Sequence, residues 1–256
     1  MKRVVVKVGS AVLTQDGSIA LERMRDLVDF LAELKKNYEV ILVSSGAVAA
    51  GYTKVKLDRS LLENKQALAS IGQPVLMNKY ARKFLRHDVF TAQILVTAAN
   101  FNKIDDIQRV KNTVNTLLNN GVLPIVNEND ATATDELVLG DNDQLSAYIT
   151  KHTNSDLLII LSDIDAYYDS DPRENKNAKV LKIVNEIKQS ELQKDVNPNN
   201  NFATGGIVTK LKAADYLLKN NIKMFLSSGF DLSDVKKIML NNKHQGGTLF
   251  LPKEMK

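Results

Sequence analysis

The sequence predicts an α/β protein, a three-layer α/β/α sandwich built around a mainly parallel central sheet. Short apolar runs rich in Val, Ile and Leu alternate with longer segments of helical periodicity. Such runs are typical of strands that are buried on both faces, as in a parallel sheet covered by helices. The predicted strands are residues 3–8, 39–43, 91–96, 122–126, 157–161 and 223–226.

Apolar side chains recur with the i, i+3, i+4 spacing of a helix face in three intervening segments, 21–34, 110–118 and 211–218. Neither an internal repeat nor a low-complexity linker interrupts the chain. We therefore expect one domain over residues 1–256, with a soft division near residue 155. Residues 195–206 are rich in Asn and Gly and are predicted to form a long mobile loop.

The composition excludes several kinds of chemistry. The chain has no Cys, which excludes disulfides, thiolate metal sites and a Cys nucleophile. Its three His are widely scattered, which argues against a zinc site or a Ser-His-Asp triad. Catalysis must then rely on carboxylates, lysines, amides and hydroxyls.

The net charge and hydropathy of the chain limit the kinds of partner that it can have. The net charge of +4 permits an anionic small molecule or a nucleic acid and decides neither. The chain has no Trp and no basic stripe interleaved with aromatic residues, so we expect no nucleic-acid partner. No apolar run approaches the roughly 18 residues that span a bilayer, and the N-terminus shows no signal-peptide pattern. We expect a cytoplasmic protein without a membrane partner.

Small polar and acidic residues follow the predicted strands. They are Gly9-Ser10, Ser44-Ser45-Gly46, Asn127 to Asp130, Ser162-Asp163 and Ser227-Ser228-Gly229. In open α/β sheets, ligands bind outside the carboxyl ends of the strands. We therefore expect these residues to line one common site.

Lys7 lies within a run of valines, two residues before the Gly9-Ser10 turn. A Lys in a buried strand must extend its ammonium to water or to an anion, and backbone N–H groups of the turn could hold a phosphate. The alternative is a Lys on an edge strand that points to solvent. The pattern does not decide between the two.

Thr204, Gly205 and Gly206 open a helix, and exposed N–H groups at a helix N-terminus attract phosphate oxygens. Lys210 follows one turn later. The segment is not a Walker A loop, because Thr209 stands where that motif needs Gly. For Lys210 alone, a solvated helix Lys is the favoured interpretation.

Residues 44–51 read SSGAVAAG, a run of small side chains. Small residues allow close approach of a ligand or of a neighbouring helix. The spacing slightly favours helix packing.

The polar run 126–147 does not match a calcium-binding loop, since Leu145 occupies a position that the loop gives to Asp or Asn. We expect a loop around Asn127 to Asp130, a hairpin over 133–140, and a helix capped by Asp141 or Asn142. Capping accounts for one acid and not for Glu128, Asp130, Asp141 and Asp143 together. At least one of these acids is therefore expected to face a cation or an ammonium group.

Two lysines near two anion sites, together with clustered carboxylates and amides, fit phosphoryl transfer. That reaction needs stabilisation of the charge on the transferred group and alignment of two oxygens, and it needs no covalent nucleophile.

The ordered motifs resemble the bacterial glutamate 5-kinase family of the amino acid kinase superfamily. They are VVKVGSAVLT, SSGAVAAG, ALASIGQPVLM, VNENDATAT, LGDNDQLSA, SDIDAYYDSDPR, TGGIVTKLKAA and GGTLF, and they cover nearly the whole chain. The resemblance implies the amino acid kinase fold and ATP-dependent phosphorylation of the γ-carboxylate of L-glutamate, the first step towards proline.

The resemblance also implies roles for individual residues. Lys7 and Lys210 match the lysines that neutralise the phosphoryl group, and Asp143 matches the acid that orients them. The implied glutamate ligands are Ser45, Asp130 and Asn142, with Asn127 and Asp141 as neighbours. The implied nucleotide site comprises Lys7, Gly9, Ser162, Asp163 and the stretch Thr204 to Lys210, within which Thr204, Gly205, Gly206 and Lys210 are the named contacts, with no metal ligand from the protein. The N-terminal part, about 1–155, would bind glutamate, and the remainder, about 156–256, would bind the nucleotide.

Elementary chemistry agrees with these implied roles. A free α-ammonium needs a carboxylate partner such as Asp130, which an acetylated amine does not. The γ-carboxylate is already ionised at neutral pH, so no general base is required. Mg²⁺ is expected to enter with ATP, held by phosphates and water.

The chain departs from the family pattern in two places. Asp165-Ala166 stands where many members of the family have a Lys-Gly pair, and this difference affects the expected geometry of the nucleotide loop. Many members carry a C-terminal RNA-binding-type PUA domain, whereas this sequence ends at Lys256; we expect the chain to lack that domain.

The resemblance further implies feedback inhibition by proline, a homo-oligomer (dimer or tetramer) and a glutamyl phosphate reductase as partner. Two alternatives stay open. One is a sister kinase that acts on another carboxylate such as N-acetylglutamate. The other is a non-catalytic, nucleotide-responsive regulator.

Overall fold

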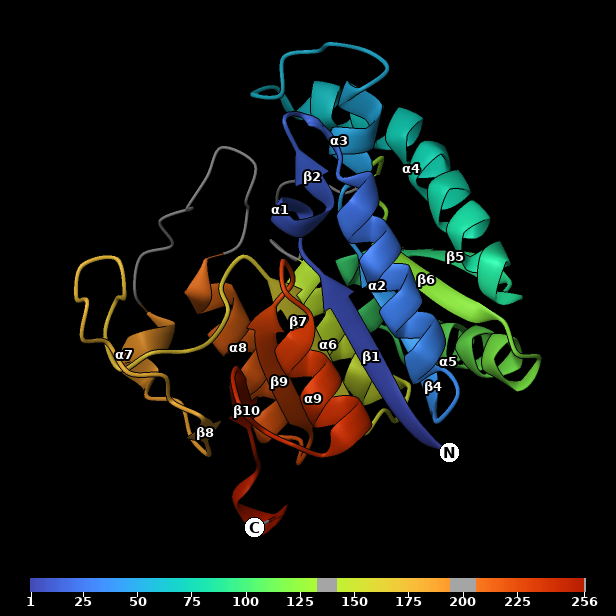
Figure 1. Cartoon of the computed structure of the whole chain (residues 1–256). Helices are drawn as coiled ribbons and strands as arrows, with labels where there is room; N and C mark the ends of the chain where they lie inside the picture. Colours follow the sequence, from blue (N-terminus) through green and yellow to red (C-terminus); the bar gives the residue numbers. More distant parts are fainter. Residues whose placement is uncertain (133–141, 194–205, 256) are drawn as a thin grey trace.

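The computed structural model describes residues 1–132, 142–193 and 206–255, and it confirms the predicted fold class (Figure 1). Within these residues the central sheet has eight strands, in the order β5-β6-β4-β1-β7-β9-β10-β8. The strands are β5 (Thr91–Val96), β6 (Leu123–Glu128), β4 (Tyr38–Ser44), β1 (Lys2–Val8), β7 (Leu157–Ser162), β9 (Lys223–Ser228), β10 (Thr248–Phe250) and β8 (Ile183–Val184). Neighbours are parallel except β10 against β9. All six predicted strands are present.

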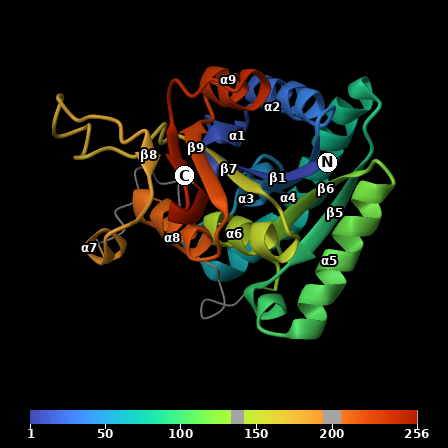
Figure 2. The same ribbon diagram turned by 90° about the horizontal axis from the view of Figure 1, so that it is seen from below.

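Helices cover both faces of the sheet (Figure 2). One face carries α2 (Leu21–Leu34), α9 (Ser233–Asn241) and the C-terminal part of α4 (Leu62–Phe84), and the other carries α5 (Ile104–Asn119), α6 (Asn142–His152) and α8 (Ile207–Leu218). The shorter elements are α1 (Ser10–Leu13), β2 (Thr14–Gln15), β3 (Ser18–Ile19), α3 (Ala47–Tyr52), η1 (Leu85–His87), η2 (Ala98–Phe101), α7 (Gln189–Leu192) and η3 (Lys253–Met255). The helices predicted from periodicity correspond to α2, α5 and α8. In the part of the chain described, no helix meets the length and hydropathy needed to cross a bilayer.

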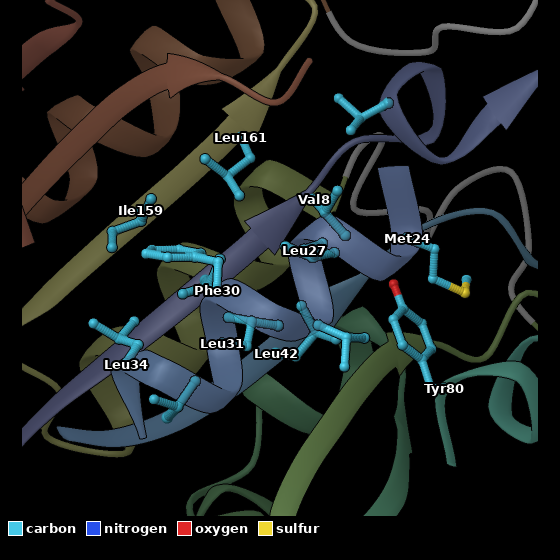
Figure 3. Close-up of a cluster of buried hydrophobic side chains, with 14 of the residues drawn as sticks. Val8, Met24, Leu27, Phe30, Leu31, Leu34, Leu42, Tyr80, Ile159 and Leu161 are labelled. Carbon is cyan, nitrogen blue, oxygen red and sulfur yellow. The ribbon is translucent and has the colours of Figure 1, made fainter. Parts of the chain in front are cut away.

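The core is divided between the two faces, because successive side chains of a strand point in opposite directions. On the α2 face, side chains from β1, β4 and β7 pack against Phe30, Leu31 and Tyr80 (Figure 3). On the α6/α8 face, Val5 of β1 packs with apolar residues of α6 and α8. Lys7 is two residues after Val5, so it shares that face and points toward α6 and α8.

The strands extend further than the sequence predicts. Asn127 and Glu128 are the last residues of β6, not loop residues, because they continue the pairing with Leu95 and Val96 of β5. In the same way Ser162 ends β7. Polar residues therefore occupy the strand ends themselves. The hairpin predicted over 133–140, and nearly all of the loop predicted over 195–206, lie outside the described residues.

The small-residue run 44–51 serves helix packing, as the spacing favoured. A Cβ on Gly51 would lie 2.0 Å from the carbonyl oxygen of Leu68 in α4. A Cβ on Gly72 of α4 would lie 1.8 Å from the carbonyl oxygen of Ala47. Both glycines are required because the backbones of α3 and α4 nearly touch. This contact fixes α4 beside the carboxyl ends of β4 and β6.

Candidate active site

A group of three buried charges lies at the carboxyl end of β1. Asp143 is fully buried, and its two oxygens face two ammonium groups: Lys7 Nζ at 2.6 Å from Oδ1 and Lys210 Nζ at 3.1 Å from Oδ2. The lysine side chains are only 3% and 2% exposed. We call Lys7, Asp143 and Lys210 the charged triad. Burial of this kind is costly unless the charges are paired, so the carboxylate holds both lysines in place.

Three separate elements build the charged triad. Strand alternation sends Lys7 toward the helices, Asp143 is the second residue of α6, and Lys210 lies in the first turn of α8. Since α6 and α8 pack side by side on the same face (Figure 2), both helix starts meet the end of β1. The predicted meeting of an acid with a cation is confirmed, with Asp143 as the acid.

Two alternatives from the sequence are wrong. β1 lies inside the sheet between β4 and β7, so Lys7 is not on an edge strand. Lys210 is not a solvated helix Lys, although its position in α8 alone favoured that interpretation, because α8 buries its first turn against α6. Tertiary packing overrides the local pattern at both positions.

Thr209 adds a third donor to Asp143. Its hydroxyl lies 2.9 Å from Asp143 Oδ2 and 2.9 Å from the carbonyl oxygen of Gly206. One hydroxyl proton cannot serve both acceptors fully, and a carboxylate is the stronger acceptor. Thr209 thus ties the first turn of α8 to the start of α6.

A second group of polar residues lies near the ends of β4 and β6. Asn142 Nδ2 is 2.8 Å from Ser45 Oγ and 3.0 Å from Asn127 Oδ1. Asn127 Nδ2 donates in turn to Gln73 Oε1 of α4 at 3.0 Å. The structure therefore brings together the predicted residues Ser45, Asn127 and Asn142. Asp141 lies outside the described residues.

A cavity of about 160 Å³ opens beside this group, between α4, β5 and the residues that follow β6. Its polar lining includes Gln73, Gln93, Glu128 and Asp130, and among the residues that the structure describes no Lys or Arg lines it. Burial raises the pKa of Asp130 to about 6, because the charged form loses solvation. An acidic, partly apolar cavity of this kind suits a small cation or ammonium group.

The residues implied for a nucleotide lie at the ends of β1 and β7. The Ser162 hydroxyl donates to Asp163 Oδ1 at 2.8 Å. The N–H of Gly9 donates to the carbonyl oxygen of Leu161 at 3.0 Å, so this N–H is used within the protein. A Cβ at Gly9 would lie 3.8 Å from Lys7 Nζ. A side chain at this position would therefore be in van der Waals contact with that ammonium.

The N-terminus of α8 begins at Gly206, its N-cap residue, as the sequence predicts. Thr204 and Gly205 lie outside the described residues. Asp165, at the departure from the family pattern, accepts hydrogen bonds from the Tyr168 hydroxyl at 3.2 and 3.0 Å, and Ala166 is buried. Asp165 therefore takes part in a local contact with Tyr168.

Sequence reasoning assigned no role to Gln73 or Gln93. Gln93 lies within a strand that was predicted from its apolar residues alone, and no helix was predicted around Gln73. Thr209 lies within the stretch from Thr204 to Lys210 that the resemblance implied for the nucleotide, but its contact with Asp143 was not expected. None of the three residues follows a predicted strand end, where polar residues were expected to line the site.

The chain belongs to the amino acid kinase family, whose sequence profile matches residues 2–228. The fold agrees: isopentenyl phosphate kinase from T. acidophilum superposes with a TM-score of 0.67 at 14% identity, covering 97% of this chain and 100% of that one.

Within the family, the chain belongs to the glutamate 5-kinase group. It is 50% identical to the glutamate 5-kinase of Leishmania donovani over 250 residues, covering 98% of this chain and 95% of that protein. It is 51% identical to that of Wolinella succinogenes over 256 residues, covering 98% of each.

Proposed function

We propose that the chain phosphorylates the γ-carboxylate of L-glutamate with ATP, which gives L-glutamyl 5-phosphate, the first step of proline biosynthesis. The observation that carries the chemistry is the charged triad, two buried ammonium groups held on one buried carboxylate. The names of the relatives at 50% and 51% identity support glutamate as the acceptor.

The charged triad suits the transition state of phosphoryl transfer. The three side chains together carry one net positive charge in a site from which water is excluded. In the proposed mechanism Lys7 and Lys210 stabilise the charge on the transferred phosphoryl group, and Asp143 fixes both ammonium groups in line with it. The ionised γ-carboxylate oxygen attacks the γ-phosphorus of ATP, and the bond from this phosphorus to the bridging oxygen breaks, so that ADP leaves. Because the nucleophile is already ionised, no proton has to be removed.

Ser45, Asp130 and Asn142 are the proposed glutamate ligands, with Asn127 and Asp141 as neighbours. Asp130 is the proposed partner of the α-ammonium, since it lines an acidic cavity. Asn142 Oδ1 is buried and has no hydrogen-bond partner among the described residues, so it offers a second acceptor. Two acceptors for one ammonium favour a free amine over an acetylated one.

The nucleotide is proposed to bind Lys7, Gly9, Ser162, Asp163 and the segment from Thr204 to Lys210. Glutamate would then be held by the N-terminal part, about 1–155, and ATP by the C-terminal part, about 156–256, across one continuous sheet. In the described part of the chain no three His, Cys, Asp or Glu side chains are placed to hold a metal. We propose that Mg²⁺ enters with ATP, held by phosphate oxygens and water, and no step above depends on a protein ligand to it.

Further proposals follow from the family. They are a cytoplasmic location, a homo-oligomer (dimer or tetramer), feedback inhibition by proline, and a glutamyl phosphate reductase that consumes the labile product. Turnover of glutamate that stays unchanged at millimolar proline would reject the inhibition.

The test is a hydroxylamine trap with purified protein, ATP and Mg²⁺, because hydroxylamine converts an acyl phosphate into a coloured hydroxamate. L-Glutamate, N-acetylglutamate and aspartate are compared. Hydroxamate with glutamate alone supports the proposal. Product only with N-acetylglutamate would indicate the sister kinase and displace the role of Asp130, and no product with any acid would favour the non-catalytic regulator.

A further inference from the structure

Four carboxamides form a continuous hydrogen-bonded chain beside the cavity. Gln73 Nε2 donates to Gln93 Oε1 at 3.3 Å, Asn127 Nδ2 donates to Gln73 Oε1 at 3.0 Å, and Asn142 Nδ2 donates to Asn127 Oδ1 at 3.0 Å. We call these residues the amide chain. It connects α4 and β5 through β6 to α6, and it ends on a proposed glutamate ligand.

Backbone groups fix which way the amides point. The N–H of Glu128 can only donate, and it lies 2.9 Å from Asn127 Oδ1. The carbonyl of Ser44 can only accept, and it lies 3.4 Å from Asn142 Nδ2. Asn127 must therefore present its oxygen to Asn142 and its nitrogen to Gln73. A flip of either Asn would place two donors or two acceptors against each other.

This arrangement uses the Asn142 nitrogen within the protein and leaves the Asn142 oxygen as an acceptor. That oxygen is buried and has no hydrogen-bond partner among the described residues. A buried acceptor without a donor is costly and is satisfied by a ligand that donates. An ammonium group is such a ligand, and the cavity that Gln73 and Gln93 line already carries the Asp130 carboxylate.

Gln73 holds the middle of the amide chain. It is 7% exposed, and its partner Asn127 is 1% exposed. Without the Gln73 carbonyl, the Asn127 nitrogen would be a buried donor with no acceptor, so the side chain would turn to find one. Asn127 Oδ1 would then leave Asn142, and the Asn142 carboxamide would lose its fixed direction.

We propose that Gln73 is a positioning residue for recognition of the substrate ammonium. It acts through Asn127 on Asn142, so that Asn142 Oδ1 faces a donor on the ligand. The inference rests on the proposed function and extends it to a residue in the middle of α4. It predicts that Gln73 affects substrates with an α-ammonium and leaves substrates without one unaffected.

The experiment compares L-glutamate with glutarate, which has the same γ-carboxylate and no ammonium. Hydroxamate formation gives kcat and KM for the wild type, Gln73→Met and Gln73→Glu. Gln66→Met is the matched control, since it removes a carboxamide from the same helix two turns earlier. Calorimetric binding of both acids repeats the comparison without turnover, and melting curves establish that each variant is folded.

For Gln73→Met we expect kcat/KM for glutamate to fall about 10- to 100-fold, mainly through KM. Glutarate should change by less than about threefold, because its binding never used the ammonium site. Gln73→Glu still offers an oxygen to Asn127 and should retain glutamate activity within about fivefold of the wild type. Gln66→Met should leave both acids unchanged.

Equal losses for glutamate and glutarate in Gln73→Met would show a purely structural role and overturn the inference, as would no loss with either acid. A wild type that does not prefer glutamate over glutarate, in turnover or binding, would overturn the proposed function together with the inference. A wild type that prefers glutamate, with a Gln73→Met variant that keeps the preference, would overturn the inference alone.

Discussion

The charged triad and the amide chain lie at the same end of the sheet and are built on opposite principles. The triad holds three full charges, all almost completely buried, and Asp143 fixes both lysines before any ligand binds. The amide chain is neutral, and among the described residues its buried oxygen Asn142 Oδ1 has no hydrogen-bond partner, so we propose that it receives the ligand.

The difference corresponds to the two proposed tasks, which are phosphoryl transfer for the charged triad and recognition of the amino acid for the amide chain. Stabilising a transferred phosphoryl group requires positive charge that is already in place, because reorganisation during the reaction would raise the barrier. Selecting one amino acid requires a polar atom that is costly to leave unpaired, so that a ligand without the matching group binds poorly. The triad should therefore control kcat, and the amide chain with Asp130 should control KM.

The largest effect on turnover is expected from a substitution that breaks the charged triad. Lys210→Met keeps the length of the side chain and removes its charge, so kcat should fall about 100- to 1000-fold. KM for glutamate should change by less than about threefold, because Lys210 is proposed to act on the transferred group. Steady-state kinetics with the hydroxamate assay measures both.

Lys212→Met is the control, since Lys212 lies in the same helix with an exposed side chain. If Lys210→Met turned over within threefold of the wild type, the assigned role of Lys210 would be wrong.

The next prediction concerns the acidic cavity and the pH dependence of kcat/KM. The pKa of Asp130 is raised to about 6, so protonation below that pH removes the proposed partner of the ammonium. We expect kcat/KM for glutamate to be flat above pH 7 and to fall about tenfold per pH unit below pH 6. The γ-carboxyl of glutamate ionises near 4.3, so it does not titrate in this window.

Asp130→Asn should abolish this acidic limb and lower kcat/KM at pH 8 by about 10- to 100-fold. Glutarate provides the control, because it has no ammonium, so Asp130→Asn should leave the pH profile for glutarate unchanged. An acidic limb that persists in Asp130→Asn would assign the titration to another group.

The smallest effect on kcat is expected from Thr209, the residue that donates a further hydrogen bond to the charged triad. Thr209→Val keeps the branched shape and removes the hydroxyl that donates to Asp143 Oδ2, so kcat should fall about fivefold. Thr209→Ser keeps the hydroxyl and should stay close to the wild type. Both values come from turnover at saturating glutamate and ATP.

Thr150→Val is the matched control, since Thr150 is a buried threonine in α6 whose hydroxyl donates to the carbonyl of Ser146. A similar loss of kcat in Thr150→Val and Thr209→Val would indicate a general packing effect and not alignment of Asp143.

The sequence predicted the six parallel strands and three of the helices, because apolar periodicity is set locally by which faces are buried. It also predicted that polar residues gather at the carboxyl ends of the strands. It misplaced the ends of β6 and β7, since polar Asn127, Glu128 and Ser162 look like loop residues until their pairing partners are known.

The resemblance named Lys7, Lys210 and Asp143, and the structure brings them within ion-pair distance. Local pattern alone could not do so for Lys210, because exposure of a helix residue depends on which helix packs against it. Gln73 shows even more clearly that a residue's role depends on tertiary contacts. The apolar periodicity of α4 does not distinguish Gln73 from the other polar residues of that helix. Its partners Gln93 and Asn127 lie on β5 and β6, 20 and 54 residues later in the sequence.

By itself, the sequence determined the sandwich through its apolar periodicity and the absence of thiol chemistry through its composition. The kind of reaction was indicated by the ordered motifs and the family that they resemble. Only the tertiary structure decided that β1 lies inside the sheet, that α6 and α8 bury two lysines on one carboxylate, and that Gln73 of α4 connects through Asn127 to Asn142 of α6, a proposed glutamate ligand. The physical reason is that burial and hydrogen-bond partners are set by contacts between distant segments, which no local pattern encodes.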